Sequence, residues 1–308
     1  MELGAHLPLI DFGDGSRSLN ELVAYATQAE ALGFTFLCAN DHLVFSRPWL
    51  DGPTALTAAI EASGGMTLAT TVALPVVRGP VQVAKTLATL DRLSGGRVVA
   101  GIGPGSSARD YAAAGVPFVE RWQRLDEAIA ALRALWQPGS PAFVGRFYST
   151  EGIVVEPGPA REAGPPIWVG SWGSAAGLRR VARLGDGWLA SGYNTTPSDF
   201  GERLDVLAGE LEAAGKQPST FPNGIATMWL YVTERKRTAD ALLADVLGPM
   251  LNRPLEELQR IPLPIGPPST CAEVLSAYAS AGAQRIFLWP LGDELRQLEL
   301  TRELVAAA

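Results

Sequence analysis

The amino-acid sequence predicts an α/β fold, a (β/α)8 barrel of parallel strands, from two patterns that run along the whole chain. Short apolar runs without polar alternation, typical of strands buried on both faces, alternate with amphipathic helical segments almost from end to end. We identify eight such strand–helix units, and eight units favour a closed barrel over an open doubly wound sheet. Because no linker separates two cores, we expect residues 1–308 to form a single domain.

The first half of the chain contains four strand–helix units. We expect strands at residues 3–7, 34–39, 67–74 and 98–102. The first helix begins at a capping box, in which the Ser18 hydroxyl accepts from a helix amide while Glu21 reaches back to the cap, and it ends at Gly33. The next helices are predicted at residues 55–62, at residues 81–93 after Pro80, and at residues 121–136.

The second half repeats the alternation around two segments rich in proline and glycine. We expect strands at residues 167–169, 188–190, 225–232 and 285–289. Helices are predicted to begin at Ser174, at Thr196-Pro197, within residues 235–237, at a cap formed by Thr270 and Glu273, and at residue 294. Residues 143–148 and 153–155 predict a hairpin insertion after the fourth helix, and residues 249–268 form a Pro-rich insertion before the eighth strand.

The composition excludes several classes of function. The formal net charge is −7, and a surface of this sign repels nucleic-acid backbones and anionic membranes, so neither is an expected partner. Two isolated cysteines, Cys38 and Cys271, and two histidines provide neither a disulfide framework nor a common zinc site. We therefore expect no metal site. Because the first residues lack a signal-like pattern and no apolar run approaches about 20 residues, we also expect a cytoplasmic protein.

Two glycine-containing motifs are interpreted as structural or are rejected. Residues 101–106 approach a dinucleotide-binding loop, but the last glycine is missing, Pro104 interrupts the turn and the acidic strand end is absent. Residues 89–97 join a helix to the next strand at the bottom of the barrel, where we expect Asp91 to pair with Arg97. No Gly-x-Ser-x-Gly sequence occurs, which argues against a serine hydrolase.

Candidate site residues are those at the carboxyl ends of the predicted strands, where barrels of this class place their active sites. His6 ends the first strand and Asp41-His42 follows the second, so an imidazole at either place suits proton exchange with a ring or substrate. Residues 101–105 let a flat ring approach the backbone, and residues 170–174 offer amides, hydroxyls and a helix start to a phosphate. The structural alternatives are histidines bonded to buried backbone, a turn capped by Asp41, a tight turn and an ordinary helix cap.

Several segments, taken in their order along the chain, resemble the bacterial luciferase-like family of flavin- and deazaflavin-dependent oxidoreductases. They are residues 29–34 before Asp41-His42, residues 84–91 with 94–97, residues 184–188 and residues 278–283. The most specific is Ala84-Lys85-Thr86-Leu87-Ala88-Thr89-Leu90-Asp91 with Ser94-Gly95-Gly96-Arg97. The likeness covers nearly the whole chain, and Asp41-His42-Leu43 together with Phe147-Tyr148 makes it closest to the branch that uses coenzyme F420.

The resemblance implies a barrel, often a homodimer, whose mouth binds F420 or FMN non-covalently. It implies that Asp41 and His42 stabilise the changing charge of the ring, that Ser106 orients the substrate, and that a cis Thr71-Val72 peptide backs the ring. The other implied cofactor contacts are His6, Gly103, Pro104, Gly105, Arg109, Gly170, Ser171, Trp172, Gly173 and Ser174.

The chain departs from its relatives at positions that concern the substrate. Where the sugar-phosphate dehydrogenases of the family have a catalytic glutamate, an asparagine and a lysine, this chain has Ser106, Arg109 and Tyr193. A small apolar substrate is therefore favoured over a sugar phosphate, and hydride transfer with reduced F420 is our first hypothesis. The alternatives are an FMN-dependent monooxygenase supplied by a separate reductase, and a barrel that binds a ligand without catalysis.

Overall fold

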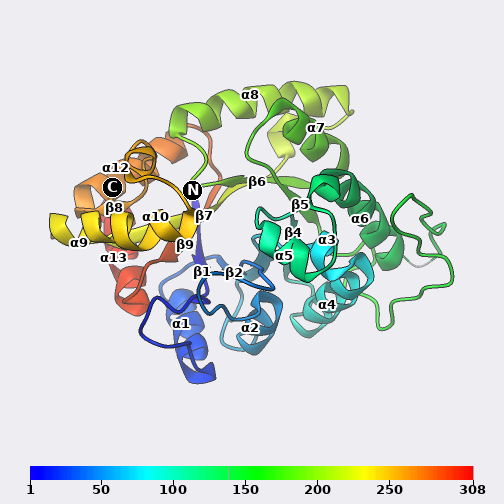
Figure 1. The fold of residues 1–308 in the computed structure, drawn as a ribbon, viewed down its shortest axis with the longest axis horizontal. Helices are drawn as coiled ribbons and strands as arrows, with labels where there is room; N and C mark the ends of the chain where they lie inside the picture. Colours follow the sequence, from blue (N-terminus) through cyan, green and yellow to red (C-terminus); the bar gives the residue numbers. More distant parts are fainter. Residues whose placement is uncertain (138, 308) are drawn as a thin grey trace.

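The structure is a computed structural model that describes residues 1–137 and 139–307; Pro138 and Ala308, both within the predicted domain, lie outside the described residues. Eight parallel strands close into a barrel, as the alternation predicts (Figure 1). They are β1 (Glu2–His6), β2 (Phe36–Ala39), β3 (Thr67–Thr70), β4 (Val98–Ile102), β5 (Ile167–Gly170), β6 (Gly187–Ser191), β7 (Asn223–Val232) and β9 (Arg285–Pro290). Successive strands pair from β1 to β7, and β9 completes the circle by pairing with both β7 and β1.

Helices surround the strands in chain order (Figure 1). The first half contains α1 (Leu19–Ala31), α2 (Gly52–Ala58), α3 (Pro75–Arg78), α4 (Pro80–Leu93), α5 (Ala108–Ala113) and α6 (Arg121–Trp136). The second half contains α7 (Ala175–Leu184), α8 (Pro197–Ala213), α9 (Lys236–Ala241), α10 (Gly248–Leu251), α11 (Leu255–Leu258), α12 (Pro268–Ser280) and α13 (Glu294–Ala307). Within the described ranges, none of these helices has the length and apolar character needed to cross a lipid bilayer.

The Pro-rich insertion adds a small element beside the barrel. Its two-residue strand β8 (Ile265–Gly266) pairs with the far end of β7, at Tyr231 and Val232. Before it, α9 continues into a π-helical turn over Leu242–Leu247, and then α10 and α11 follow. The insertion is therefore ordered around the end of β7 and reaches toward the carboxyl face of the barrel.

The barrel interior is filled by side chains. Alternate strand residues point inward and form one apolar cluster of Phe36, Cys38, Ala69, Val99, Trp168, Leu189, Ala226 and Phe287. Gly4 belongs to this layer because a Cβ at that position would meet the Phe287 ring at 2.4 Å. Because apolar side chains fill the interior, the polar side chains that could bind or react with a ligand lie in the loops at the carboxyl ends of the strands.

Local predictions that depend on neighbouring residues are confirmed. Ser18 and Glu21 form the capping box of α1, and Gly33 follows that helix with a φ of +77°. Thr196 caps α8. Cys38 and Cys271 are buried and are not in a disulfide. Caps and helix ends are predictable because they depend on side chains only a few positions away.

Several predicted element boundaries are wrong. The second helix, predicted at residues 55–62, is α2 at Gly52–Ala58, and the second strand begins at Phe36 instead of residue 34. β3 ends at Thr70 instead of residue 74, because beyond it the backbone turns toward the Asp41 carboxylate, which accepts from the Leu74 amide. The hairpin predicted within residues 143–155 is reduced to a bridge, because the Glu127 carboxylate takes the amides of residues 146–148. α12 begins at Pro268, and Thr270 consequently lies inside that helix instead of at its cap.

The expected pairing of Asp91 with Arg97 is also wrong. Asp91 Oδ1 accepts from Arg161 Nη2 at 2.6 Å and from the Val98 amide at 3.3 Å, and its Oδ2 accepts from the amides of residues 160–161. Arg97 donates to a backbone carbonyl instead. Because Asp91 is fully buried, this carboxylate fastens the first insertion to the amino-terminal end of β4.

We expect Asp91→Ala to lower the free energy of unfolding by about 3 kcal/mol, because it removes the acceptor of a guanidinium and three amides. As a control, Asp240→Ala breaks an exposed ion pair with Lys236 and should change this free energy by less than about 0.5 kcal/mol. Urea denaturation followed by circular dichroism measures both changes. A loss below about 1 kcal/mol at Asp91 would show that other contacts hold the insertion.

Candidate active site

A cavity of about 490 Å³ opens at the carboxyl ends of the strands, where the barrel architecture predicts the site. Its lining comes from the loops that follow β2, β3, β4, β5, β6 and from β7. Of the residues predicted from the sequence, it includes Asp41, His42, Thr71, Val72, Gly103, Pro104, Gly105, Ser106, Gly170, Ser171, Trp172, Gly173 and Ser174. His6 and Arg109 are outside this lining: His6 is buried below it, and Arg109 is exposed on α5.

One wall of the cavity is the segment that follows β3. The Thr71–Val72 peptide bond is cis, as the sequence analysis expects. The Val72 side chain lies between two glycines: a Cβ on Gly103 would meet Val72 Cγ2 at 2.6 Å, and a Cβ on Gly170 would meet Cγ1 at 3.1 Å. Gly103 and Gly170 therefore make room for the Val72 side chain. From the sequence, the glycines at residues 101–105 are expected to let a ring approach the backbone.

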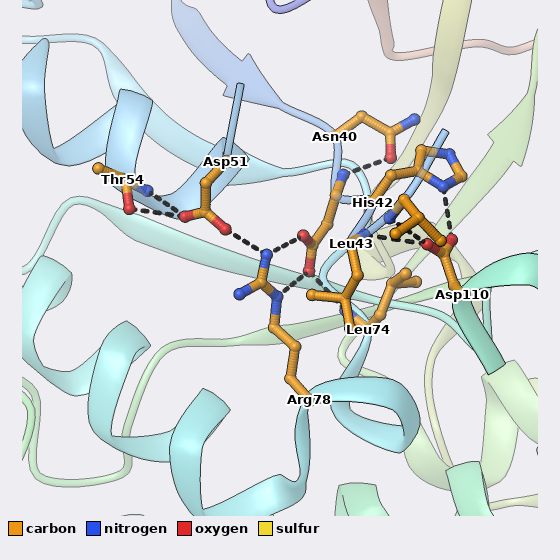
Figure 2. Close-up of polar contacts among 10 residues, drawn as sticks. Asn40, His42, Leu43, Asp51, Thr54, Leu74, Arg78 and Asp110 are labelled. Atoms are coloured by element: carbon orange, nitrogen blue, oxygen red, sulfur yellow. Dashed lines mark hydrogen bonds and ion pairs between the residues drawn. The ribbon is translucent and has the colours of Figure 1, made fainter. Parts of the chain in front are cut away.

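A buried ion pair joins this wall to the loop after β2 (Figure 2). Asp41 is 1% exposed; its Oδ1 accepts from Arg78 Nη2 at 2.5 Å and its Oδ2 from Arg78 Nε at 2.8 Å. Oδ2 also accepts from the Leu74 amide at 3.2 Å. Arg78, at the end of α3, contacts in addition Asp51, which caps α2. The Asp41 carboxylate is thus engaged by the protein, and it connects the loops after β2 and β3.

His42 is held by a carboxylate that the sequence analysis did not identify. Its Nδ1 lies 2.6 Å from Asp110 Oδ2, and Asp110 Oδ1 accepts from the amides of Leu43 and Val44 at 3.0 and 2.9 Å (Figure 2). Because a carboxylate only accepts, Nδ1 carries a hydrogen and Nε2 is the ring nitrogen available to a ligand. The only local signal of Asp110 is its place three residues after Ser107, the N-cap of α5.

Asp110 is charged at neutral pH despite its burial. Burial raises the pKa of this carboxyl, but the hydrogen bonds from His42 and from the Val44 and Leu43 amides outweigh it and hold the pKa below the ordinary value of 3.8. The negative charge fixes the tautomer and the orientation of the His42 ring. It also stabilises the imidazolium that forms if Nε2 takes a proton.

The second histidine lies beneath the mouth. The His6 ring is fully buried and stacks on Trp289 with a centroid distance of 3.4 Å, and its Nδ1 donates to the Leu7 carbonyl at 2.8 Å. Burial lowers the pKa of His6 to about 3, against the smaller raising effect of the Leu7 hydrogen bond. The ring is therefore neutral at physiological pH, and its Nε2 is buried without a hydrogen-bond partner among the described residues.

The part of the cavity lined by the loop before α7 contains groups that attract an anion. Ser171, Gly173 and Ser174 precede α7, and Ser174 caps this helix by accepting from an amide of its first turn. Two cations, Arg121 and Arg203, line the same cavity. Arg203 passes next to Gly173, where a Cβ would meet its Cδ at 2.2 Å. A helix start with the Arg203 guanidinium beside it is a favourable place for phosphate or carboxylate oxygens, and Arg121, next to Phe118 and Trp122, adds a second positive charge to the cavity.

Sequence reasoning missed Arg121 and Arg203 because each lies in a helix whose local pattern is ordinary. In residues 1–137 and 139–307, no group of three or more His, Cys, Asp or Glu side chains is arranged to hold a metal ion. The groups that line the described site and can donate, accept or carry charge include the His42 imidazole, several hydroxyls and the two cations.

The chain is similar in sequence to a described family and to F420-dependent dehydrogenases. Residues 8–253 match the profile of a family described as luciferase-like monooxygenase. F420-dependent hydroxymycolic acid dehydrogenase of Mycobacterium tuberculosis is 33% identical over 212 residues, which cover 66% of this chain but only 56% of that protein, so the chain spans about half of its length. An F420-dependent glucose-6-phosphate dehydrogenase of Nocardia farcinica is 26% identical, and the alignment covers 97% of this chain and 95% of that protein.

Solved structures share the fold at low sequence identity. An F420-dependent secondary alcohol dehydrogenase in complex with an F420–acetone adduct superposes with a TM-score of 0.85 and 18% identity, covering 99% of this chain and 98% of that one. The oxygenating constituent of 3,6-diketocamphane monooxygenase from Pseudomonas putida, in complex with FMN, gives a TM-score of 0.76 and 16% identity, covering 100% and 98%. These likenesses support the closed barrel.

The Asp110 contacts predict a pH dependence of stability. Because the pKa of Asp110 is lower in the folded protein, its contribution is fully present above the ordinary pKa of 3.8 and is lost as pH falls through the folded value. We therefore expect Asp110→Asn to be less stable than the unmodified protein at pH 7, and the difference to shrink as pH falls below about 4. Urea denaturation between pH 7 and pH 3 measures this difference. A difference that is constant over this range would contradict a stabilising charge at Asp110.

Proposed function

This chain belongs to the luciferase-like monooxygenase family, and we propose that it is an F420-dependent oxidoreductase that transfers a hydride between the deazaflavin and an organic, mainly apolar substrate. The observation that carries the proposal is the combination, in one cavity, of the Val72 wall, the Asp110-oriented His42 and an end suited to anions. Relatives named as F420-dependent dehydrogenases support the choice of cofactor.

The lining of the cavity fits a planar ring with an anionic tail. Thr71 Oγ1 is buried, and its neighbouring polar group is the Cys38 thiol, a weak hydrogen-bond partner, so a polar atom of a bound ring would satisfy it better. Val72 offers the ring an apolar surface. Arg121, Arg203 and the start of α7 would hold the phosphate and carboxylates of the tail.

When bound, F420 supplies a carbon that accepts or releases a hydride. The protein would contribute placement and proton handling. His42 Nε2 is positioned to take or give a proton at the mouth, and Asp110 stabilises the charged ring that results. Phe118, Trp122 and Trp172 give the cavity an aromatic surface that would pack against a bound ligand.

The proposal of an apolar substrate rests on the uncharged side chains that line the rest of the cavity. Apart from Asp41, His42 and the two cations assigned to the tail, the side chains that line the cavity are uncharged. Leu74, Leu189, Ala190 and Ala226 add apolar surface. An uncharged organic molecule would leave no buried charge without a partner there, whereas an anion would.

An FMN-dependent monooxygenase, supplied with reduced cofactor by a separate protein, is the second candidate. The structural likeness to an oxygenase in complex with FMN favours it. The cavity would accommodate either ring with its phosphate. The identity of the bound cofactor therefore distinguishes the two candidates. A homodimer is part of both proposals.

Equilibrium titration of the purified protein with F420 and with FMN, followed by fluorescence, tests the cofactor. We expect F420 to bind at least about tenfold more tightly, which corresponds to about 1.4 kcal/mol. Tighter binding of FMN would move the function to the monooxygenase alternative. Binding of neither would contradict both and leave the non-catalytic barrel.

A variant of the anionic-tail site provides an independent check. Arg203→Gln should weaken F420 binding about tenfold and leave the affinity for the deazaflavin riboside, which lacks the phosphate tail, nearly unchanged. Arg109→Gln is the matched control, because Arg109 is exposed and outside the cavity lining. Equal effects on F420 and on the riboside would mean that Arg203 acts on the fold of the mouth and not on the tail.

A further inference from the structure

Tyr193 and Ser106 come together in the cavity from two different loops. Tyr193 follows β6 and Ser106 follows β4, and both line the cavity. The Tyr193 side chain lines the cavity together with Ser106 and Ser191, and its hydroxyl lies near the side chains of Ser106, Ser191 and Asn194. Burial raises the pKa of Tyr193, with smaller lowering effects from Arg253 and these hydroxyl and amide groups, so the phenol keeps its proton at neutral pH. The pair therefore offers uncharged donors to a ligand.

Arg253 in the Pro-rich insertion holds Tyr193 in place. Its Nη1 donates to the Tyr193 carbonyl at 2.8 Å, and its Nη2 donates to Asn194 Oδ1. The guanidinium carbon lies 5.4 Å from the centroid of the Tyr193 ring, within the range of a cation–π contact. On its other side Arg253 pairs with Glu257 at 3.3 Å. Because these partners occupy the guanidinium and Arg253 does not line the cavity, it positions Tyr193 and does not present a positive charge to a ligand.

We infer that Tyr193, assisted by Ser106 and positioned by Arg253, binds the uncharged carbonyl or hydroxyl oxygen of the substrate and selects against phosphorylated substrates. A carbonyl oxygen accepts from the phenol and the serine hydroxyl without any need for a counter-charge. A phosphate at the same place would lose its hydration next to uncharged hydroxyl groups, which is unfavourable. The neighbouring cation Arg203 already donates to the Asn194 carbonyl at 3.2 Å and to Thr195 Oγ1 at 2.8 Å, and the proposed function assigns it to the cofactor tail. This inference rests on the proposed function and names the substrate class for it.

This placement of Tyr193 is suited to the reduction of a ketone to a secondary alcohol. With reduced F420 bound, the carbonyl carbon would receive a hydride and form a C–H bond while the carbonyl π electrons move to the oxygen. The oxygen would take the phenol proton of Tyr193, and Tyr193 would regain a proton from solvent, which receives the proton that the cofactor loses on oxidation. The ketone is reduced to a secondary alcohol and the deazaflavin is oxidised; the reverse reaction oxidises the alcohol.

The test measures ligand binding to the F420-loaded protein by calorimetry, with cyclohexanone, 2-decanone and glucose 6-phosphate as probes. At least one ketone should bind, and glucose 6-phosphate should not. Tyr193→Phe should weaken ketone binding about tenfold and Ser106→Ala about threefold, with the affinity for F420 unchanged in both. If circular dichroism shows that Tyr193→Phe is not folded, Ser106→Ala carries the same test.

The positioning role of Arg253 is tested in the same assay. Arg253→Met should reproduce the loss of ketone affinity, and Arg253→Lys should restore it only in part, because an ammonium lacks the planar fork. Arg260→Met is the control, since Arg260 is an exposed arginine in the same insertion.

Three results would overturn the inference: glucose 6-phosphate binding more tightly than the ketones, no binding of either ketone, or unchanged ketone affinity in both Tyr193→Phe and Ser106→Ala. Failure of the unmodified protein to bind F420 is a separate outcome that overturns the proposed cofactor. The two failures are distinguishable because the F420 titration is completed before any ketone is added.

Discussion

The ion pair between Asp41 and Arg78 is the interaction on which the geometry of the mouth depends. A carboxylate that is 1% exposed persists inside a protein only when it is paired and hydrogen-bonded, and Arg78 provides both from the end of α3. Two sides of the cavity follow from this contact. Val72 lies just before the Leu74 amide that Asp41 binds, and His42 is the residue after Asp41. Movement of the guanidinium would therefore displace the apolar wall and the imidazole together.

The rest of the mouth is assembled from segments far apart in the chain. A parallel barrel brings the carboxyl ends of all its strands to one face, so short loops from different strands supply separate chemical groups. Asp110 orients the His42 ring across 68 residues, and Arg203 approaches the start of α7 only because Gly173 has no side chain. The two insertions differ in role: Asp91 fastens the first at the amino-terminal end of β4, whereas Arg253 brings the second to the mouth.

Much of the fold was predictable because its signals are local or periodic. Buried strands without alternation, the Ser18 capping box and the turn at Gly33 each depend on residues close in sequence. Two of the errors have a common cause in distant side chains that take backbone amides: Glu127 at residues 146–148 and Asp41 at Leu74. A local pattern carries no information about a carboxylate that arrives from another helix or loop.

By itself, then, the sequence determined the eight strand–helix units and the face of the barrel that carries the site, because these follow from hydrophobic period and from the order of strands and loops. The residues chosen at the strand ends and from the family resemblance make up about half of the cavity lining. Only the tertiary structure decided which groups act together. It stacked His6 on Trp289, placed Val72 against Gly103, and paired His42 with Asp110 and Tyr193 with Arg253. The physical reason is that orientation, burial and charge pairing depend on distances in space, which no spacing along the chain records.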